Sequence, residues 1–179
     1  MSGLPAKIVA LHKSLERASL PHAFGGALAL AWCTQRARGT IDIDINIFVS
    51  PQHSATVFKC LPAGVTRDTK DLDVIQRDGQ VRLWWEQTPI DLFLNTTRFH
   101  DEAAARTRWE TFSNRQMPFL ACEDIAVFKA FFNRTKDWAD LEEMYAAGTL
   151  DVSIVITVLA DYLGAADERI ERLKAIAGR

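Results

Sequence analysis

The stretch Arg38-Gly-Thr-Ile-Asp-Ile-Asp-Ile-Asn-Ile-Phe-Val49, in one-letter code RGTIDIDINIFV, alternates polar and apolar residues almost without a break. This period of two is typical of a β-strand with one buried face, because successive side chains of a strand point to opposite sides. The residues expected to face the core are Ile41, Ile43, Ile45 and Ile47, and those expected on the opposite face are Asp42, Asp44 and Asn46. Two carboxylates about 7 Å apart on one strand face repel each other. We therefore expect a cation between Asp42 and Asp44.

The composition is that of an ordinary globular protein. With 179 residues, of which 48% are hydrophobic and 25% charged, the chain can bury a substantial core as one domain, or as a domain with a small appendage. A net charge of −2 argues against a dedicated nucleic-acid binder with a large basic surface, although it leaves room for a local basic cleft. The first twenty residues carry charges every few positions, so we expect neither a signal peptide nor a membrane span, and a soluble cytoplasmic protein.

The cysteines support the same location. Cys33, Cys60 and Cys122 are odd in number and widely spaced, which fits reduced thiols better than a disulfide framework or a zinc site. We therefore expect no disulfide bond.

The order of the expected elements predicts an α+β fold. A helix over residues 6–20 is followed by a short strand, a turn at Gly25-Gly26, a helix, the strand quoted above and a helix over 52–61. Asp78-Gly79 predicts a hairpin between two strands within residues 65–86, and a last strand is expected over 90–94. Helices are then expected over 101–109, 122–132, 137–147, 152–162 and 166–177. We predict a small mixed β-sheet flanked by helices (1–98), followed by a C-terminal helical region (99–179) packed against it.

Three features of the predicted sheet suggest phosphate chemistry. Gly25-Gly26 lies at a strand-to-helix turn, where glycine lets the backbone approach a phosphate and the helix presents unpaired N–H groups. Asp42 and Asp44 offer the oxygen ligands that Mg²⁺ prefers. Asp91, on a later strand, could serve a second ion and accept a proton from an attacking hydroxyl.

Together these motifs resemble the nucleotidyltransferase superfamily to which DNA polymerase beta belongs. Its signature is a Gly-Gly or Gly-Ser turn, then Asp-x-Asp, then a third Asp on a neighbouring strand. The resemblance is closest to the AbiEii-like branch and similar minimal nucleotidyltransferases, whose second motif often reads Arg-x-Thr-x-Asp-x-Asp. The residues that match this motif are Arg38, Thr40, Asp42 and Asp44. Those that match a later helix pair of that branch are Glu123, Asp124, Lys129, Arg134, Lys136, Asp137 and Asp140.

The resemblance implies a polymerase beta-type core that transfers a nucleoside monophosphate from an NTP, such as ATP, to a hydroxyl group. The implied catalytic and metal-binding residues are Asp42, Asp44 and Asp91, with two Mg²⁺ ions as cofactors. The residues implied to bind the nucleotide phosphates are Gly25, Gly26, Arg38, Thr40 and Lys129. The expected acceptor is a small molecule, a tRNA or a protein. The AbiEii-like branch adds an antitoxin as a further partner, and no membrane partner is expected.

Simpler interpretations stay open beside these. Asp42 and Asp44 could line a solvated strand face, Gly25-Gly26 could form a plain turn, and Lys129 could extend its amine to water from an apolar helix side. Arg38 and Thr40 could brace the strand. The group whose role is undecided between function and scaffold comprises Arg134, Lys136, Asp137 and Asp140. The whole chain could also be a catalytically inactive nucleotide-binding or protein-interaction module of the same fold, or a divergent α/β protein with an incidental Asp-x-Asp.

Overall fold

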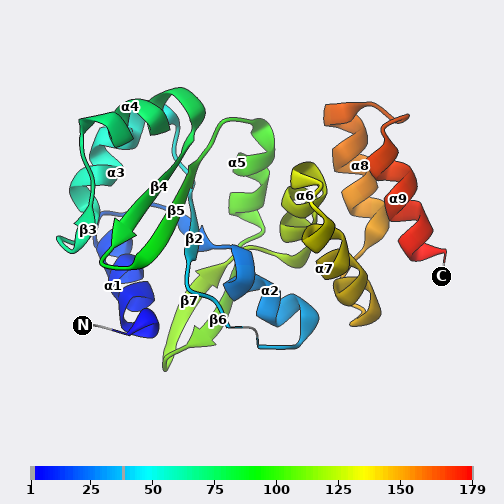
Figure 1. Cartoon of the computed structure of the whole chain (residues 1–179), viewed down its shortest axis with the longest axis horizontal. Coiled ribbons are helices and arrows are strands. Elements are labelled where there is room, and N and C mark those ends of the chain that lie inside the picture. Colours follow the sequence, from blue (N-terminus) through cyan, green and yellow to red (C-terminus); the bar gives the residue numbers. More distant parts are fainter. Residues whose placement is uncertain (1–2, 38, 179) are drawn as a thin grey trace. The chain divides into compact units, whose positions relative to one another are not determined.

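The computed structural model describes residues 3–37 and 39–178, and the strands within these residues form one mixed sheet. The strands are β1 (His22–Phe24), β2 (Ile43–Ile47), β3 (Val65–Thr66), β4 (Gln80–Trp85), β5 (Thr88–Leu94), β6 (Arg108–Phe112) and β7 (Arg115–Phe119). Their order in the sheet is β3-β4-β5-β2-β1-β7-β6 (Figure 1). β2 runs parallel to β5 and antiparallel to β1, and β4 runs antiparallel to β5. The predicted α+β class with a mixed sheet is therefore confirmed.

The helices precede, interrupt and follow these strands. They are α1 (Leu4–Arg17), α2 (Gly26–Thr34), α3 (Ser54–Cys60), α4 (Thr69–Asp78), α5 (Arg98–Ala105), α6 (Cys122–Phe132), α7 (Thr135–Ala146), α8 (Val152–Leu163) and α9 (Glu168–Ala177), with a short 3₁₀ turn over Pro51–His53. Within the described parts of the chain, no helix is both long enough and apolar enough to cross a bilayer.

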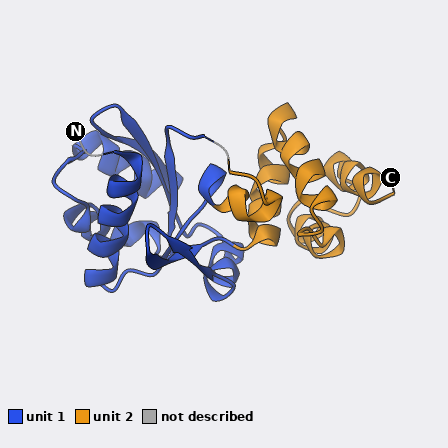
Figure 2. Ribbon diagram, turned by 90° about the horizontal axis from the view of Figure 1, so that it is seen from below, with its two compact units in different colours: residues 1–28, 39–120 blue, residues 29–38, 121–179 orange. Residues whose placement is uncertain are grey.

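The chain folds as two compact units (Figure 2). Unit 1 comprises residues 1–28 and 39–120 and holds the sheet, and unit 2 comprises residues 29–38 and 121–179 and holds α6 to α9. α2 begins in unit 1 and ends in unit 2. The sequence places the boundary between residues 98 and 99, whereas the units change between 120 and 121, because β6 and β7 join the sheet.

The core of unit 1 follows the alternation of the central strands. On β2, Ile43, Ile45 and Ile47 are fully buried, as predicted. The neighbouring strands contribute Val81, Leu83, Ile90, Leu92 and Leu94, and helices α1, α3 and α4 contribute Ile8, Leu11, Leu15, Val57 and Ile75. Ile41 is 78% exposed, so its predicted place in the core is wrong. The reason is that β2 begins only at Ile43, and the two residues before it are not paired in the sheet.

Two hairpins differ from the sequence expectation. A strand was expected before Asp78-Gly79, but a capping box of Asp68 and Asp71 starts helix α4 there. Asp78 is the last residue of this helix, and Gly79 caps it with a left-handed backbone (φ +70°). The actual hairpin joins β4 to β5 at Glu86-Gln87. A second hairpin, β6–β7, was missed altogether. It turns at Ser113-Asn114, where both residues have positive φ, as a type I′ turn requires.

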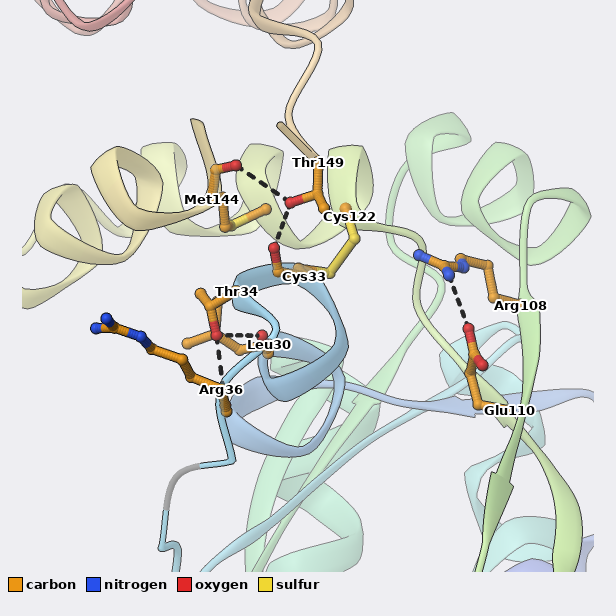
Figure 3. Close-up of a disulfide and its surroundings, with 9 residues drawn as sticks. All are labelled: Leu30, Cys33, Thr34, Arg36, Arg108, Glu110, Cys122, Met144 and Thr149. Atoms are coloured by element: carbon orange, nitrogen blue, oxygen red, sulfur yellow. Dashed lines mark hydrogen bonds and ion pairs between the residues drawn. A yellow bond between two sulfur atoms is a disulfide. The ribbon is translucent and has the colours of Figure 1, made fainter. Parts of the chain in front are cut away.

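Unit 2 contains a disulfide bond between Cys33 near the end of α2 and Cys122 at the start of α6, with the two Cα atoms 5.5 Å apart (Figure 3). The Thr149 hydroxyl donates a hydrogen bond to the Cys33 carbonyl beside it. The expectation of no disulfide is thus wrong, because folding joins two segments 89 residues apart. Cys60 is a free thiol. A cytoplasmic location stays a prediction.

Candidate active site

One charged row crosses three adjacent strands of unit 1. The register places Asp44 of β2 opposite Asp91 of β5, and Asp91 opposite Arg82 of β4. Side chains of paired residues on neighbouring strands point to the same face of a sheet. The neighbouring residues Ile43, Ile45, Leu83, Ile90 and Leu92 on these strands are buried, so this acid row (Arg82, Asp91, Asp44) lies on the face opposite them.

Asp44 is held against the turn that starts helix α2. The N–H of Gly25 donates to the Asp44 carbonyl at 2.9 Å. Gly26 has φ +51°, and a Cβ at this position would lie 1.9 Å from Asp44 Oδ2. A side chain at residue 26 would therefore both strain the backbone and displace the Asp44 carboxylate. The predicted Gly-Gly turn has a structural use that the sequence did not specify: it gives room to the carboxylate.

The same turn determines which backbone N–H groups could bind a phosphate group. Because Gly25 uses its N–H for the Asp44 carbonyl, that group is not the donor for a phosphate. Gly26 is the first residue of α2, and the first N–H groups of a helix have no partner within the helix and carry partial positive charge. The start of α2 thus remains the part of the turn suited to an anion.

Asp42 lies just before β2 and is oriented by Thr40. The Thr40 hydroxyl donates to Asp42 Oδ1, and it accepts a hydrogen bond from the Asp42 N–H at 3.3 Å. Thr40 thus holds the Asp42 carboxylate in one orientation. Its two predicted roles, bracing the strand and contacting phosphate, both stay predictions. Arg38, also predicted to bind phosphate, lies outside the described residues.

Asp91 is engaged by Arg82 in a two-pronged ion pair. Arg82 Nε lies 2.7 Å from Asp91 Oδ1, and Nη2 lies 2.6 Å from Oδ2. The Asp91 side chain is 17% exposed and that of Arg82 is 53% exposed. Hydrogen bonding to Asp91 and its charge raise the pKa of the Arg82 guanidinium above its ordinary value, and the charges of Asp42 and Asp44 add to the effect. Arg82 is therefore within the field of all three predicted catalytic acids.

Arg82 belongs to this site but to none of the sequence motifs that predicted it. Its signal was the alternation Val81-Arg82-Leu83-Trp84, which marks a strand with one polar face. With the turn wrongly placed at Asp78-Gly79, the register that sets Arg82 opposite Asp91 could not be derived. Trp84, two residues along the same strand, is 46% exposed.

The predicted metal ligands have the donor chemistry that a divalent cation needs. Among residues 3–37 and 39–178, no three His, Cys, Asp or Glu side chains gather into a group that could hold a metal ion. Mg²⁺ usually takes only one or two carboxylates and completes its shell with water and substrate phosphates. Asp42 and Asp44 supply such a pair of oxygen donors. The donor chemistry therefore fits Mg²⁺, whereas Asp91 is occupied by Arg82.

Lys129, predicted to bind phosphate, belongs to unit 2 and forms ion pairs there. Its Nζ lies 2.6 Å from Asp140 Oδ2 and 3.4 Å from Asp137 Oδ1. Asp137 also accepts hydrogen bonds from the N–H and the side chain of Arg134. Burial raises the pKa of the Asp137 carboxyl, but the hydrogen bond from Arg134 and the charges of Lys129 and Arg134 outweigh it, so the net shift is downward. Three of the undecided residues thus form a partly buried charge network with Lys129.

The chain matches one family model and several solved structures. A family model described as "Nucleotidyltransferase of unknown function (DUF6036)" matches residues 23–175. The comparison with curated proteins found no match. The crystal structure of ANT(2")-Ia in complex with adenylyl-2"-tobramycin is 12% identical with a TM-score of 0.56, and the match covers 98% of this chain and 97% of that chain.

Two further solved structures are similar to the chain. Lincosamide antibiotic adenylyltransferase LnuA with bound lincomycin is 13% identical with a TM-score of 0.54, over 79% of this chain and 96% of that chain. An antigenic nucleotidyltransferase-like protein from Paracoccidioides brasiliensis is 15% identical with a TM-score of 0.54, over 98% and 94%. At these identities the likeness shows a shared fold.

Proposed function

The chain belongs to the family of nucleotidyltransferases of unknown function, DUF6036, and from this premise we propose that it transfers a nucleoside monophosphate from an NTP to a hydroxyl group of an acceptor, releasing pyrophosphate. Membership confirms the superfamily expected from the sequence. The AbiEii-like branch stays a prediction.

One observation supports the proposal above the others. Asp44 and Asp91 stand opposite each other on adjacent parallel strands, and the Asp44 carboxylate fills the space that Gly26 leaves at the start of α2. A carboxylate at a helix N-terminus, with a second carboxylate on the neighbouring strand, brings cation ligands and an anion-binding end of a helix to one region of the sheet. Transfer of a charged phosphoryl group needs that combination.

Each residue has a role in this proposal. Asp42 and Asp44 would hold Mg²⁺, which would neutralise the charge of the nucleotide phosphates. Thr40 keeps the Asp42 carboxylate in one orientation. The first N–H groups of α2 would orient a phosphate group. Asp91 would accept the proton of the acceptor hydroxyl, for which its carboxylate must first leave Arg82.

For the acceptor we propose a small hydroxylated molecule. ANT(2")-Ia was solved with adenylyl-2"-tobramycin and LnuA with lincomycin, and both share the fold of this chain. A net charge of −2 gives no general attraction for a large RNA. A tRNA or protein acceptor, with an antitoxin that restrains the enzyme, is the alternative that follows from the AbiEii-like resemblance.

A second candidate function is a nucleotide-binding or protein-interaction module without turnover. The Arg82–Asp91 pair favours it, because an acid held by two hydrogen bonds from an arginine is not available as a proton acceptor. The two functions differ in whether a labelled product forms.

The test is transfer of label from each of four α-labelled NTPs, with Mg²⁺, to an acceptor panel of aminoglycosides, a lincosamide, total tRNA and cell lysate. We expect Asp44→Asn to reduce product formation by about 100-fold or more, since lost metal ligation removes several kcal/mol of transition-state stabilisation. Asp73→Asn is the matched control, because Asp73 is an exposed acid on α4. No product from the folded wild type with any NTP would instead support the binding module.

A further inference from the structure

In the Arg82–Asp91 pair, a positively charged guanidinium lies where a metal cation would contact the carboxylate. A guanidinium stays protonated throughout the physiological pH range and presents a rigid fork that matches both oxygens of a carboxylate. The guanidinium forms an ion pair with Asp91, and it also lies in the field of Asp42 and Asp44. A divalent cation that used Asp91 would therefore have to replace the guanidinium.

We propose that Arg82 is a positioning residue that holds Asp91 while no divalent cation is bound and competes with that cation for the Asp91 carboxylate. The inference rests on the proposed metal-dependent function. It adds a residue that sets the affinity for the cation and keeps the third acid out of use until the cation arrives.

The exposure of the pair makes the exchange feasible. The Arg82 side chain is 53% exposed, so its charge can move into water without becoming buried and unpaired. Asp91 is only 17% exposed, so it stays in place on the sheet when the guanidinium leaves. Ion pairs open to solvent contribute little to stability, and a divalent charge can outcompete them.

The pairing also determines which oxygens of Asp91 are engaged. The two hydrogen bonds use both oxygens of the Asp91 carboxylate. This is consistent with the lack of a three-acid group among the residues that the structure describes. Release of Arg82 frees both oxygens of Asp91, whose register partner on β2 is Asp44.

The test measures binding of Mn²⁺ by electron paramagnetic resonance in the absence of nucleotide, so its readout is independent of activity. We expect Arg82→Gln to bind Mn²⁺ about 3- to 10-fold more tightly than the wild type, because the competing cation is gone. Arg82→Lys keeps the positive charge but loses the fork, and we expect it to bind more tightly than the wild type as well. If Arg82→Gln bound Mn²⁺ no more tightly than the wild type, Arg82 would not compete with the cation, and the proposal would be overturned.

Two controls locate the effect. Arg77 makes the same two-pronged contact with Asp78 on α4, so Arg77→Gln removes an equivalent pair elsewhere and should leave Mn²⁺ affinity unchanged. In an Asp91→Asn background, Arg82→Gln should lose its effect on Mn²⁺ affinity, because the carboxylate over which the two cations compete is absent. An undiminished effect in that background would overturn the proposal.

The outcome also separates this inference from the proposed function. If the wild type shows no Mn²⁺ binding that Asp44→Asn weakens, the metal-dependent function and this inference both fail. If such binding exists but neither Arg82 variant changes it, the inference alone is overturned. Thermal unfolding without metal, recorded for each variant, establishes that the folded state is being compared.

Discussion

Gly26 is the residue at which backbone conformation and the acid row depend on each other. Its φ of +51° is in the left-handed region, and its missing Cβ is the space that the Asp44 carboxylate occupies. Gly148 also has a positive φ (+70°), but a Cβ there would meet nothing within 4 Å. The two glycines therefore separate the cost of backbone strain from the cost of steric overlap.

We expect Gly148→Ala to lower the free energy of unfolding by about 1–2 kcal/mol, which is the cost of left-handed backbone for a residue with a Cβ. Gly26→Ala should cost about 1–3 kcal/mol more, because overlap with Asp44 forces local rearrangement. It should also weaken Mn²⁺ binding, which Gly148→Ala should not. Denaturant unfolding and Mn²⁺ titration of both variants check this. Equal losses of stability would show that the Asp44 carboxylate does not fill that space.

Lys129 shows how a partner in the fold changes the interpretation of a residue. From the sequence, its two alternatives were a phosphate contact and an amine extended to water. In unit 2 its amine lies between Asp137, whose side chain is fully buried, and Asp140, which is 8% exposed. Removing one member of a buried ion pair leaves an uncompensated charge, which is strongly destabilising.

We therefore expect Lys129→Met to lower the free energy of unfolding by about 3–5 kcal/mol. The control is Lys174→Met, because Lys174 pairs with Glu171 in solvent and its loss should cost at most about 1 kcal/mol. Equilibrium unfolding in urea provides the comparison. If Lys129→Met keeps its stability but raises the KM for the NTP, the predicted phosphate contact gains support instead.

The acids of the candidate site could be predicted from the sequence because their signal is local. Asp42 and Asp44 lie within one alternating stretch, and Asp91 is the single acid of an apolar strand. Arg82 could not be found in this way. Its importance arises from the pairing of β4 with β5, and pairing depends on where the turn between two strands lies.

At the scale of elements, the dipeptide Asp78-Gly79 is compatible with two different structures. Asp-Gly is typical of a type I′ hairpin, yet glycine with positive φ is equally common just after a helix. Asp68 and Asp71 decide between them, because their reciprocal hydrogen bonds start helix α4 ten residues earlier. The strand β6 was missed for another reason: it forms the sheet edge and has no fully buried side, so its hydrophobic period is weak.

The contact of α1 with β1 contains two buried histidines. Nδ1 of His22 donates to the Leu20 carbonyl at 2.8 Å, and its Nε2 lies 3.0 Å from Nδ1 of His12. The neutral His22 ring can thus accept a hydrogen bond from His12 at Nε2. Burial lowers the pKa of His22 to about 4; the Leu20 hydrogen bond opposes this, the charge of His12 adds to it, and Glu16 opposes it.

This lowered pKa predicts a pH dependence of stability. The unfolded chain takes up a proton on His22 near pH 6.5, whereas the folded chain does so only near pH 4. The contribution of His22 to the free energy of unfolding is therefore fully present above about pH 6.5 and is lost as the pH falls toward 4. At 1.36 kcal/mol per pKa unit, the total loss is about 3 kcal/mol.

We expect His22→Asn to flatten the dependence of the unfolding free energy on pH between 6.5 and 4, measured by urea unfolding at intervals of pH. Its control is His53→Asn, because His53 is exposed and its replacement should leave the slope unchanged. If His22→Asn kept the pH dependence of the wild type, other groups would cause that dependence. The buried His12 would then be the first candidate.

At the scale of the whole chain, the two units do not follow the order of the sequence. Unit 2 combines residues 29–38 with residues 121–179, so a segment from the first quarter of the chain folds with the last third. Local patterns predicted most of its helices, and α6 has the predicted bounds. They could not predict this pairing, because contacts between distant segments leave no period in the sequence.

The Cys33–Cys122 disulfide joins these two segments of unit 2 (Figure 3). A cross-link over 89 residues removes many conformations from the unfolded chain, so we expect reduction to lower the free energy of unfolding by about 2–4 kcal/mol. Guanidinium unfolding with and without dithiothreitol measures the loss. Cys60→Ala should respond to dithiothreitol like the wild type, because Cys60 is a free thiol. Cys33→Ala/Cys122→Ala should not respond at all. A wild type that unfolds at the same midpoint in both conditions would mean that folding alone, without the bond, holds α2 to α6.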